Sequence, residues 1–387
     1  MNPLKRPKSR FLILLGVALI GSILLVTCTY EVTSQGQKSQ VTQTATPSSH
    51  LPPEMILGVG GGVDLNTSYP GIPWVRLSYP TCGLGNLSGQ ALKDTIQSFH
   101  NMNIQVMLTL CQVRGESLFD MTRLNDVAQA KADAVQCGNE QMKNSPATIY
   151  IPPDQFAKFY DLCEKAVHTV RPDIPVILGA LNPQVVGDDL SPLLNQVHYL
   201  DAMQSAMNTS VHQGGTWDWH SQVVGLIDSW HNGYPSDGVN NLQKLFAFWA
   251  QQFHVDLNSG ELGNHLWVIE GTGCFKQCGL DTNNSREIAV SHILTLITDV
   301  QTTLKYHVPF FYFSGRDFII DTTTWPIGLL DVNGHPKPLR QDLPMGARTL
   351  QLSCSGGTTT VTDQENLLAK LYAGCTLPGN AESILKS

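Results

Sequence analysis

Charged residues are scarce in this chain of 387 residues. Asp, Glu, Lys and Arg make up 14% of it, whereas apolar residues make up 42%. Four of the 24 Lys and Arg residues precede Cys28, so 20 remain after it against 32 Asp and Glu residues. An excess of acidic groups repels nucleic acid and anionic lipid, and the apolar content is ample for a large core. The composition therefore argues against a nucleic-acid-binding or disordered protein and suits an extracellular enzyme.

Several motifs that define other kinds of site are missing. No tight Cys-x-x-Cys pair and no His-x-x-x-His spacing supports a zinc site. The glycine-rich run Gly58-Val59-Gly60-Gly61-Gly62 has the wrong context and spacing for a dinucleotide site, and we interpret it as a tight turn at a strand end. No phosphate-binding loop, Ser-His-Asp arrangement or internal repeat stands out. We therefore expect neither a metal nor a cofactor.

The N-terminus differs from the rest of the chain. A basic head, Lys5 to Arg10, precedes an uncharged apolar run over 11–26, which is typical of an export signal. The run is near the lower limit for a spanning helix, about 17 residues. The stretch Leu-Val-Thr-Cys ending at Cys28 resembles a bacterial lipoprotein cleavage box, although Gly or Ala usually stands where Thr27 does. A lipidated Cys28, a spanning anchor and an ordinary cleaved signal remain open, and each predicts an extracellular or cell-surface protein, membrane-anchored in the first two cases.

An even number of cysteines remains once Cys28 is set aside. In an exported chain an even number favours disulfides. A Cys354–Cys375 bond would close the C-terminal segment and a Cys274–Cys278 bond a small loop, although the spacing does not determine the pairing. The eight cysteines are Cys82, Cys111, Cys137, Cys163, Cys274, Cys278, Cys354 and Cys375.

Eight segments after residue 54 have the composition of buried strands. Continuous apolar runs such as WVRL, VMLTL and VPFFYF indicate burial on both faces, as in a parallel sheet covered by helices. The predicted strands are Ile56–Val63, Trp74–Tyr79, Ile104–Leu110, Ala134–Asn139, Pro175–Leu181, Val223–Trp230, His265–Glu270 and Val308–Phe313.

Helical patterns alternate with these strands. The clearest begins at Pro152-Pro153-Asp154, carries an apolar stripe and stops before Pro172. The first crossover, 64–73, is too short for a normal helix. Strands alternating with helices in this number predict an α/β fold, a (β/α)8 TIM barrel, with a doubly wound open sheet as the alternative. The other predicted helices are 88–102, 190–207, 239–253 and 284–304.

The chain divides into four predicted parts. Residues 1–28 are the export or anchor segment, and residues 29–53, rich in Ser, Thr, Gln and Pro, are a disordered linker. Residues 54–350 form the barrel. Residues 351–387 form a short extension with a Gly-Thr-rich turn and a helical stretch over 365–372. We expect a monomer.

Polar residues end several of the predicted strands. In a (β/α)8 barrel the active site is built at the carboxyl ends of the strands, so these residues are candidates for chemistry. They are Arg76 on strand two, Asn139 and Glu140 after strand four, His231 and Tyr234 near the end of strand six, Glu270 on strand seven, and Arg316 and Asp317 after strand eight.

This order of residues resembles the large clan of retaining (β/α)8-barrel glycoside hydrolases. In that clan an Asn-Glu pair ends strand four and supplies the general acid/base, and a Glu ending strand seven is the nucleophile. Asn139-Glu140 and Glu270 match these places. Arg76 falls where the clan places an arginine beside the nucleophile, and Tyr234 resembles its strand-six tyrosine.

The resemblance covers roughly residues 55–345, because GLLDVNGHPKP, residues 328–338, is also similar to the clan's ending after strand eight. It implies cleavage of a β-glycosidic bond with Glu140 as acid/base and Glu270 as nucleophile, and Asn139 bound to a sugar hydroxyl. The chemistry agrees, because retaining glycosidases need two carboxyls about 5–5.5 Å apart and strands four and seven face each other across a barrel mouth.

Each candidate also has a plain structural interpretation. Gly138-Asn139-Glu140 is common turn chemistry, and Glu270 before a glycine-rich stretch suits a capped turn. Arg76 suits a buried ion pair, as do Arg316 and Asp317 with each other. The polar groups of His231 and Tyr234 suit the edge of a core.

Tryptophans favour a sugar ligand, because indole faces stack on pyranose rings. Trp217, Trp219 and Trp230 cluster in GTWDWHSQVVGLIDSW, and Trp217 and Trp219 lie in a polar loop that suggests a sugar subsite, with core packing as the alternative. The clan's usual tryptophan after strand eight is replaced by Tyr312-Phe313-Ser314-Gly315, and its strand-three histidine is missing. These departures concern the substrate more than the mechanism.

The leading prediction is a retaining glycoside hydrolase acting on an oligo- or polysaccharide, with mannan, xylan, glucan and galactan all open. Three alternatives remain. A surface carbohydrate-binding lipoprotein would use a barrel without turnover. A transglycosidase would use the same two glutamates with a sugar acceptor. A barrel enzyme of unrelated chemistry is the third, because a fold does not determine a function.

Overall fold

A computed structural model describes most of the chain beyond residue 56. The predicted export segment, Cys28, the linker, His231, Tyr234 and the Cys274–Cys278 loop lie outside the described residues. No described helix is both long and apolar enough to cross a membrane. The described residues are 57–63, 65, 72–82, 86–112, 120–144, 150–182, 189–228, 241–271, 296, 298–320, 323–325, 327–337, 350–361, 366, 369–371 and 373–376.

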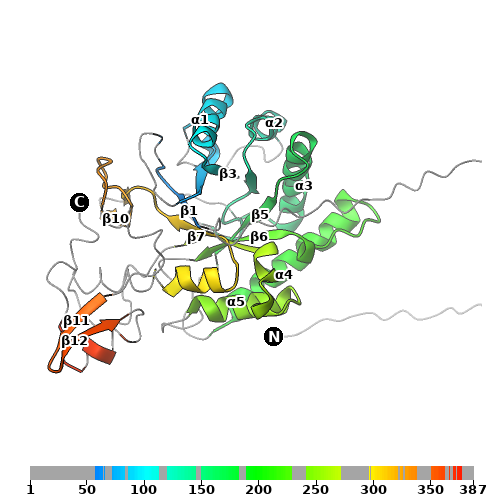
Figure 1. The fold of residues 1–387 in the computed structure, drawn as a ribbon. Helices are drawn as coiled ribbons and strands as arrows, with labels where there is room; N and C mark the ends of the chain where they lie inside the picture. The colour runs from blue at the N-terminus through cyan, green and yellow to red at the C-terminus, as the bar shows by residue number, and fades with distance from the viewer. Residues whose placement is uncertain are drawn as a thin grey trace, which may run out of the picture. The chain divides into compact units, whose positions relative to one another are not determined.

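Eight parallel strands close into a barrel, because β1 pairs with both β2 and β8. This confirms the predicted (β/α)8 barrel and excludes the open doubly wound sheet. Seven of the eight predicted segments contain an observed strand, and the eighth, His265–Glu270, misses only the last residue of β7, Gly271. These are β1 Leu57–Gly60, β2 Trp74–Ser78, β3 Gln105–Leu110, β4 Ala134–Cys137, β5 Val176–Leu181, β6 Val223–Asp228, β7 Leu266–Gly271 and β8 Phe310–Phe313 (Figure 1).

Helices cover the outside of the barrel. Figure 1 shows α1, α2 and α3 following one another around the strands, with α4 next. The predictions over 88–102, 190–207 and 239–253 are confirmed within two residues at each end, and the helix at Pro153 ends before Arg171 as predicted. The labelled helices are α1 Gly89–Asn101, α2 Met121–Gln129, α3 Pro153–Val170, α4 Ser191–Ala206 and α5 Asn241–Gln252, and residues 298–305 form a further helical stretch.

Helix α2 was not predicted from the sequence. It has only nine residues and buries only Leu124, Val127 and Ala128, so its apolar stripe is short. Its start does carry a signal, because the Asp120 side chain accepts a hydrogen bond from the Thr122 backbone N–H. The helix is stabilised mainly by packing against α3, a contact that becomes visible only in the folded chain.

Along a regular strand such as β3, alternate residues face inward or outward, as the period of two requires. In β3, Val106, Leu108 and Leu110 pack against the helices, whereas Met107 belongs to a separate cluster inside the barrel. Three aromatic rings of that inner cluster, Trp74, Trp267 and Phe311, lie 6.1–6.3 Å apart between centroids. The inside of the barrel is therefore packed with side chains, and a ligand can enter only at its mouth.

Three disulfides join described cysteines. The predicted Cys354–Cys375 bond is confirmed. Cys82–Cys111 links the segments that follow β2 and β3, and Cys137–Cys163 ties the last residue of β4 to α3. Two of the three bonds therefore lie beside the carboxyl ends of strands where the candidate site residues lie.

Replacing both Cys137 and Cys163 with serine should lower the free energy of unfolding by about 2–4 kcal/mol, because the bond closes a loop with a sequence separation of 26 residues. Urea unfolding monitored by circular dichroism measures the effect. The Cys354→Ser/Cys375→Ser variant is the control for removing a disulfide with a similar separation of 21 residues. Equal stability of wild type and the Cys137→Ser/Cys163→Ser variant would show that the bond does not constrain the chain.

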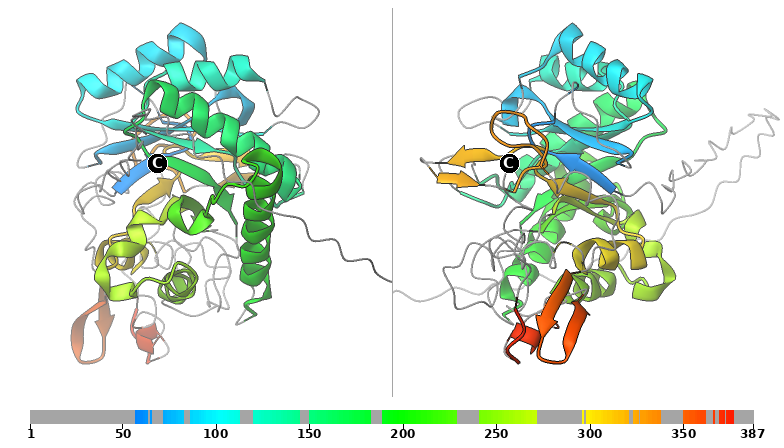
Figure 2. Two further views of the ribbon diagram at one scale, coloured as in Figure 1. Left: turned by 90° about the vertical axis from the view of Figure 1, so that its right-hand side faces the viewer. Right: turned by 60° about the vertical axis from the view of Figure 1, so that its left-hand side comes forward.

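Two hairpins follow the barrel strands. The first pairs β9 Phe318–Ile320 with β10 Thr323–Trp325, and the second pairs β11 Leu350–Cys354 with β12 Gly357–Val361 (Figure 2). The Gly-Thr-rich stretch is therefore mostly strand β12, and the turn is limited to Ser355-Gly356. Alternating threonines explain this, because β-branched residues favour extended backbone. Residues 369–371 are helical, within the predicted stretch 365–372.

Candidate active site

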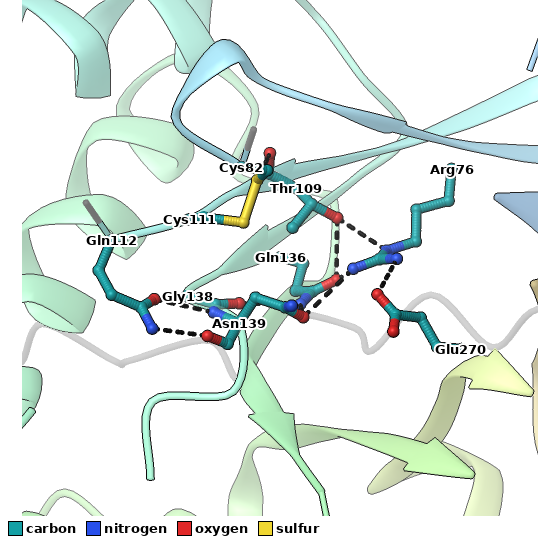
Figure 3. The surroundings of a disulfide bond; sticks show 9 residues. All are labelled: Arg76, Cys82, Thr109, Cys111, Gln112, Gln136, Gly138, Asn139 and Glu270. Carbon is teal, nitrogen blue, oxygen red and sulfur yellow. Dashed lines mark hydrogen bonds and ion pairs between the residues drawn. A yellow bond between two sulfur atoms is a disulfide. The ribbon is translucent and has the colours of Figure 1, made fainter. Parts of the chain in front are cut away.

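The structure brings Arg76 and Glu270 together at the mouth of the barrel. Arg76 Nη1 lies 2.6 Å from Glu270 Oε1 (Figure 3). Their side chains are 4% and 15% exposed, so this ion pair lies mostly out of the solvent. Arg76 points inward because it follows the inward-facing Trp74 by two residues on β2. The prediction that this arginine lies beside the strand-seven glutamate is confirmed.

A polar layer holds the guanidinium of Arg76 in place. Its Nε donates to Thr109 Oγ1 at 2.9 Å and to Gln136 Oε1 at 3.1 Å, and its Nη2 donates to Asn139 Oδ1 at 3.3 Å. Thr109 also donates to Gln136 at 2.9 Å. The sequence analysis missed Thr109 and Gln136. Their signal was a single polar residue in each of the buried strands VMLTL and AVQC, at a position that faces the barrel interior.

The electrostatics of Glu270 indicate a second carboxylate nearby. Burial raises the pKa of Glu270 above its usual value, and the charge of Arg76 and its hydrogen bond lower it. The negative charge of Glu140 also raises this pKa, so the two carboxyls lie within electrostatic reach of each other. Glu140 follows β4 and Glu270 lies on β7, so both are at the carboxyl ends of the barrel strands.

A β-bulge in β7 sets the orientation of the Glu270 side chain. Leu226 of β6 pairs with Val268, but the next residue, Ile227, pairs with Glu270, so β7 contains one extra residue. The pairing with β8 shows the same shift. Val268 packs outward against the helices, and strict alternation would turn Glu270 outward as well. The extra residue breaks the alternation and turns Glu270 toward Arg76.

The turn that follows β4 is held in one conformation by side-chain contacts and is not a simple surface turn. Gly138 and Glu140 adopt φ values of +94° and +48°. A Cβ on Gly138 would lie 2.6 Å from the Phe156 ring, so this position requires glycine. Gln112 clamps the next residue, because its amide donates to the Asn139 carbonyl at 2.6 Å and accepts from the Asn139 N–H at 3.0 Å.

Gln141, for which the sequence suggested no role, fixes the backbone beside Glu140. Its side chain is fully buried, and its Oε1 accepts from the Ala180 N–H at 3.2 Å. It fills the space above Gly179, where a Cβ would lie 2.5 Å from that oxygen. Its carbonyl accepts from the Ile151 N–H at 2.9 Å. Glu140 is therefore held between two anchored neighbours, Asn139 and Gln141.

Two further side chains contact the carboxylate of Glu140. Lys143 Nζ lies 2.9 Å from its Oε1, and Asn182 Nδ2 donates to the same oxygen at 2.7 Å. The Glu140 side chain is 14% exposed, so the carboxylate is largely enclosed. The sequence analysis named neither partner. Asn182 directly follows β5, and a polar residue at a strand end was the signal that could have identified it.

The tryptophan prediction is corrected for Trp219. Its ring is 1% exposed and packs against Trp249 and Phe253, so no sugar can stack on it. Trp217 is partly buried, with its ring against Tyr160. Both residues precede β6 and so lie at the amino ends of the strands, whereas the candidate site lies at the carboxyl ends. The polar loop that suggested a subsite lies at the wrong end of the barrel.

Asp317 forms an ion pair with a buried lysine. Lys337, which is fully buried, donates to its Oδ1 at 2.7 Å, and the Gly328 N–H donates to the same oxygen at 2.6 Å. The bonds join the segment after β8 to the GLLDVNGHPKP stretch. Asp317 is therefore in an ion pair, with Lys337, a partner that the sequence analysis did not name. Arg316 forms a β-bridge with Leu330 in the same segment. Substrate binding by Arg316 stays a prediction.

No group of three or more His, Cys, Asp or Glu side chains in the described part of the chain could hold a metal ion. The described residues at the site supply two carboxylates, an arginine, a lysine and several amides. His231 and Tyr234 lie outside the described residues, so their roles remain predictions.

The chain matches no protein-family model and no curated protein. Among solved structures it is similar to a glycoside hydrolase family 128 (subgroup II) endo-β-1,3-glucanase from Sorangium cellulosum, at 15% identity and a TM-score of 0.47, covering 76% of this chain and 98% of the other. A glucosidase from Croceicoccus marinus has 13% identity and a TM-score of 0.48, covering 81% of this chain and 71% of the other. A family 128 (subgroup VII) oligosaccharide-binding protein from Cryptococcus neoformans has 14% identity and a TM-score of 0.47, covering 78% of this chain and 96% of the other.

These values are too low to assign a substrate. The predicted resemblance to the barrel clan of glycoside hydrolases is confirmed at the level of the fold, by the closed barrel of eight parallel strands. The fold and the site together define a (β/α)8 barrel with a pair of glutamates at the ends of strands four and seven.

Proposed function

We propose that this protein is a retaining β-glycosidase that acts on an oligo- or polysaccharide. One observation carries the proposal: Glu140 and Glu270 lie at the same end of the barrel, within electrostatic reach of each other and in different surroundings. Glu270 is paired with Arg76 at 2.6 Å, whereas Glu140 lies beside amide groups and Lys143. Two carboxyls in distinct environments are what double displacement requires.

In the first step the Glu270 carboxylate attacks the anomeric carbon while the bond from that carbon to the leaving oxygen breaks. Glu140 gives its proton to that oxygen, and a glycosyl ester of Glu270 forms. In the second step Glu140, now a carboxylate, takes a proton from water. The water oxygen attacks the anomeric carbon, and Glu270 leaves as a carboxylate, so the sugar keeps its β configuration.

Asn139 is suited to hold a sugar hydroxyl. Its Oδ1 accepts from Arg76 at 3.3 Å and from Gln136 Nε2 at 3.0 Å, which determines which way the amide faces. The Nδ2 group remains as a donor directed by these contacts. This geometry supports the role that the family resemblance implies for Asn139, next to the reacting carbon.

The ion pair between Lys143 and Glu140 favours a second candidate, a carbohydrate-binding protein without turnover. A general acid must reach the leaving oxygen, and here Oε1 of Glu140 is already in contact with the Lys143 ammonium at 2.9 Å. An enzyme must separate this pair before Glu140 can donate a proton, whereas a binding protein can keep it.

A substrate panel tests the two candidates. Residues 51–387 and the Glu270→Gln variant would be incubated with aryl β-glycosides and with plant and fungal glucans, mannans, xylans and galactans. Release of aryl alcohol or reducing sugar by the wild type alone establishes a glycosidase and identifies its sugar. Tight sugar binding without any turnover supports the binding protein, and neither turnover nor binding contradicts both.

Replacing Arg76 with methionine should move the acidic limb of the kcat/KM profile to higher pH. The charge of Arg76 lowers the pKa of Glu270, so its removal raises that pKa further. At a given pH less Glu270 is then ionised and able to attack. We expect kcat/KM at neutral pH to fall on the order of 100-fold. Arg171→Met, at an arginine paired with the exposed Asp173, is the control, and an unchanged acidic limb would contradict the role of Arg76.

We also propose that the protein works outside the cell, at a bacterial surface. The disulfides support this, because such bonds persist in oxidising compartments. The basic head, the apolar run and Cys28 support attachment through a lipid on Cys28, with a spanning anchor or a cleaved signal as alternatives. Labelling cells with an alkyne fatty acid separates these cases, because only a lipidated Cys28 gives a signal that Cys28→Ser removes.

A further inference from the structure

The Cys82–Cys111 disulfide lies at the same end of the barrel as the two glutamates, although it takes no part in the chemistry proposed above. It joins the segments that follow β2 and β3, and its two Cα atoms are 4.8 Å apart. The backbone pairing of β3 with β4 ends just before it, where the Gly138 N–H donates to the Leu110 carbonyl at 2.8 Å. Beyond Leu110, the disulfide therefore holds the chain to the neighbouring segment.

Gln112, the residue after this disulfide, continues the connection to β4 through its side chain. Figure 3 shows the carboxamide facing the backbone of Asn139. Its Oε1 accepts from the Asn139 N–H at 3.0 Å, and its Nε2 donates to the Asn139 carbonyl at 2.6 Å. A carboxamide carries the same donor and acceptor as a peptide group, so Gln112 takes the place of strand pairing where β4 has ended. The residue is only 8% exposed, so water competes little for these two bonds.

These bonds fix the conformation of Glu140. Its φ of +48° is one that a residue other than glycine adopts only where the surroundings hold it. The Asn139 carbonyl belongs to the peptide group that joins Asn139 to Glu140, so the bond from Gln112 fixes the rotation of that group. The Asn139 side chain depends less on Gln112, because Arg76 and Gln136 hold its Oδ1 at 3.3 and 3.0 Å. Loosening the Gln112 bonds therefore acts mainly on the direction of the Glu140 carboxyl.

We propose that Gln112, fastened by the Cys82–Cys111 disulfide, is a positioning residue for Glu140. The inference rests on the proposed function, in which Glu140 gives a proton to the leaving oxygen and later takes one from water. Each transfer requires the carboxyl to lie within hydrogen-bond reach of the oxygen, and a displacement of about 1 Å can cost on the order of 100-fold in rate. The disulfide acts on the same turn through Gln112, so opening it should have the same kind of effect as removing the Gln112 amide.

Two variants test the proposal on substrates that differ in their need for a proton. Gln112→Met keeps the length of the side chain and removes both hydrogen-bonding groups, and Cys82→Ser/Cys111→Ser removes the disulfide. We expect both to lower kcat/KM about 10- to 100-fold for the oligosaccharides that the wild type cleaves. For the dinitrophenyl glycoside of the same sugar, kcat/KM should change less than about twofold, because its first step needs no proton.

The pattern of losses decides the outcome. Equal losses of kcat/KM on both substrates would show a general defect of the site and overturn the proposal, as would no loss on either. A loss confined to Gln112→Met would overturn the part given to the disulfide.

Hydrogen exchange measures the same contact without turnover. The Asn139 N–H is bound to Gln112 Oε1, so this amide should exchange about tenfold faster in both variants, measured by mass spectrometry on a peptide over 138–142. If the wild type cleaves nothing, the glycosidase proposal fails, and hydrogen exchange alone decides. Faster exchange in both variants then supports Gln112 as the residue that positions the turn, and unchanged exchange overturns it.

Matched controls separate these effects from the substitutions themselves. Gln129→Met makes the same change at an exposed position of α2. Cys354→Ser/Cys375→Ser removes a disulfide beyond the barrel strands, with a sequence separation of 21 residues against 29 for Cys82–Cys111. An equal effect of either control on kcat/KM or on exchange over 138–142 would overturn the proposal. Circular dichroism checks folding; if Gln112→Met does not fold, Gln112→Ala, which leaves room for water beside the Asn139 peptide groups, replaces it.

Discussion

Replacing Glu270 with glutamine should lower kcat on the order of 10⁴- to 10⁶-fold, because an amide cannot form the glycosyl ester through which double displacement proceeds. The loss should be equal for aryl glycosides and for oligosaccharides, since both pass through the same ester. Substrate affinity should change little, because glutamine keeps the shape of the side chain. Initial rates and a calorimetric Kd measure the two effects separately.

The barrel should stay folded in Glu270→Gln, although its stability should fall. Arg76 loses its charge partner at 2.6 Å but keeps its bonds to Thr109 and Gln136. Breaking one side of a mostly buried ion pair is destabilising, whereas removing a carboxylate whose pKa burial raises relieves part of that loss. Circular dichroism and the melting temperature would check this. Glu261→Gln, at an exposed glutamate before β7, is the control, and activity left in Glu270→Gln would show that the nucleophile lies elsewhere.

Replacing Glu140 with alanine should give a different pattern. Removing a general acid/base costs on the order of 10²- to 10⁴-fold for substrates whose leaving group needs a proton. A dinitrophenyl glycoside needs no such proton, so its first step should proceed at nearly the normal rate. The glycosyl ester of Glu270 should then accumulate, because no base activates the water. A burst of dinitrophenol followed by slow turnover is the expected observation.

Added azide distinguishes the two glutamates. Azide needs no general base, so it should restore turnover of Glu140→Ala and give a β-glycosyl azide, since the second displacement returns the original configuration. Azide should not rescue Glu270→Ala in this way, because that variant forms no ester for azide to attack. Azide can instead attack the substrate directly and give an α-glycosyl azide, and this product identifies the missing residue as the nucleophile. An α-azide from Glu140→Ala would therefore exchange the two assignments. Glu261→Ala controls for azide effects on the folded protein.

The neighbours of Glu140 explain why its environment differs from that of Glu270. Glu270 lies against one arginine that is locked by three other side chains, Thr109, Gln136 and Asn139. Glu140 has a lysine on a flexible stem and an amide, and both contact the same oxygen, Oε1. The charge of Glu270 is therefore held by a fixed arginine and that of Glu140 by a longer, more flexible side chain, a difference that suits the proposed two-step mechanism.

The sequence alone determined the architecture of this protein. Continuous apolar runs separated by helical patterns predicted all eight strands, because strands buried on both faces need apolar side chains along their whole length. The same reasoning located Arg76, Asn139, Glu140 and Glu270, because polar residues at the carboxyl ends of such strands must converge at one end of a barrel. Helix α2 was missed because its apolar stripe is too short to stand out.

Only the tertiary structure decided how those residues are aimed and what surrounds them. The orientation of Glu270 depends on an extra residue in β7, which becomes apparent only from the pairing of β7 with its neighbours. Trp219 was assigned to a sugar site from the polar composition of its loop, and the packing of its ring against Trp249 and Phe253 shows that it belongs to the core. Asn182 and Gln196 meet beside Glu140 from β5 and α4, and such a contact depends on how distant segments pack, which local sequence patterns do not encode.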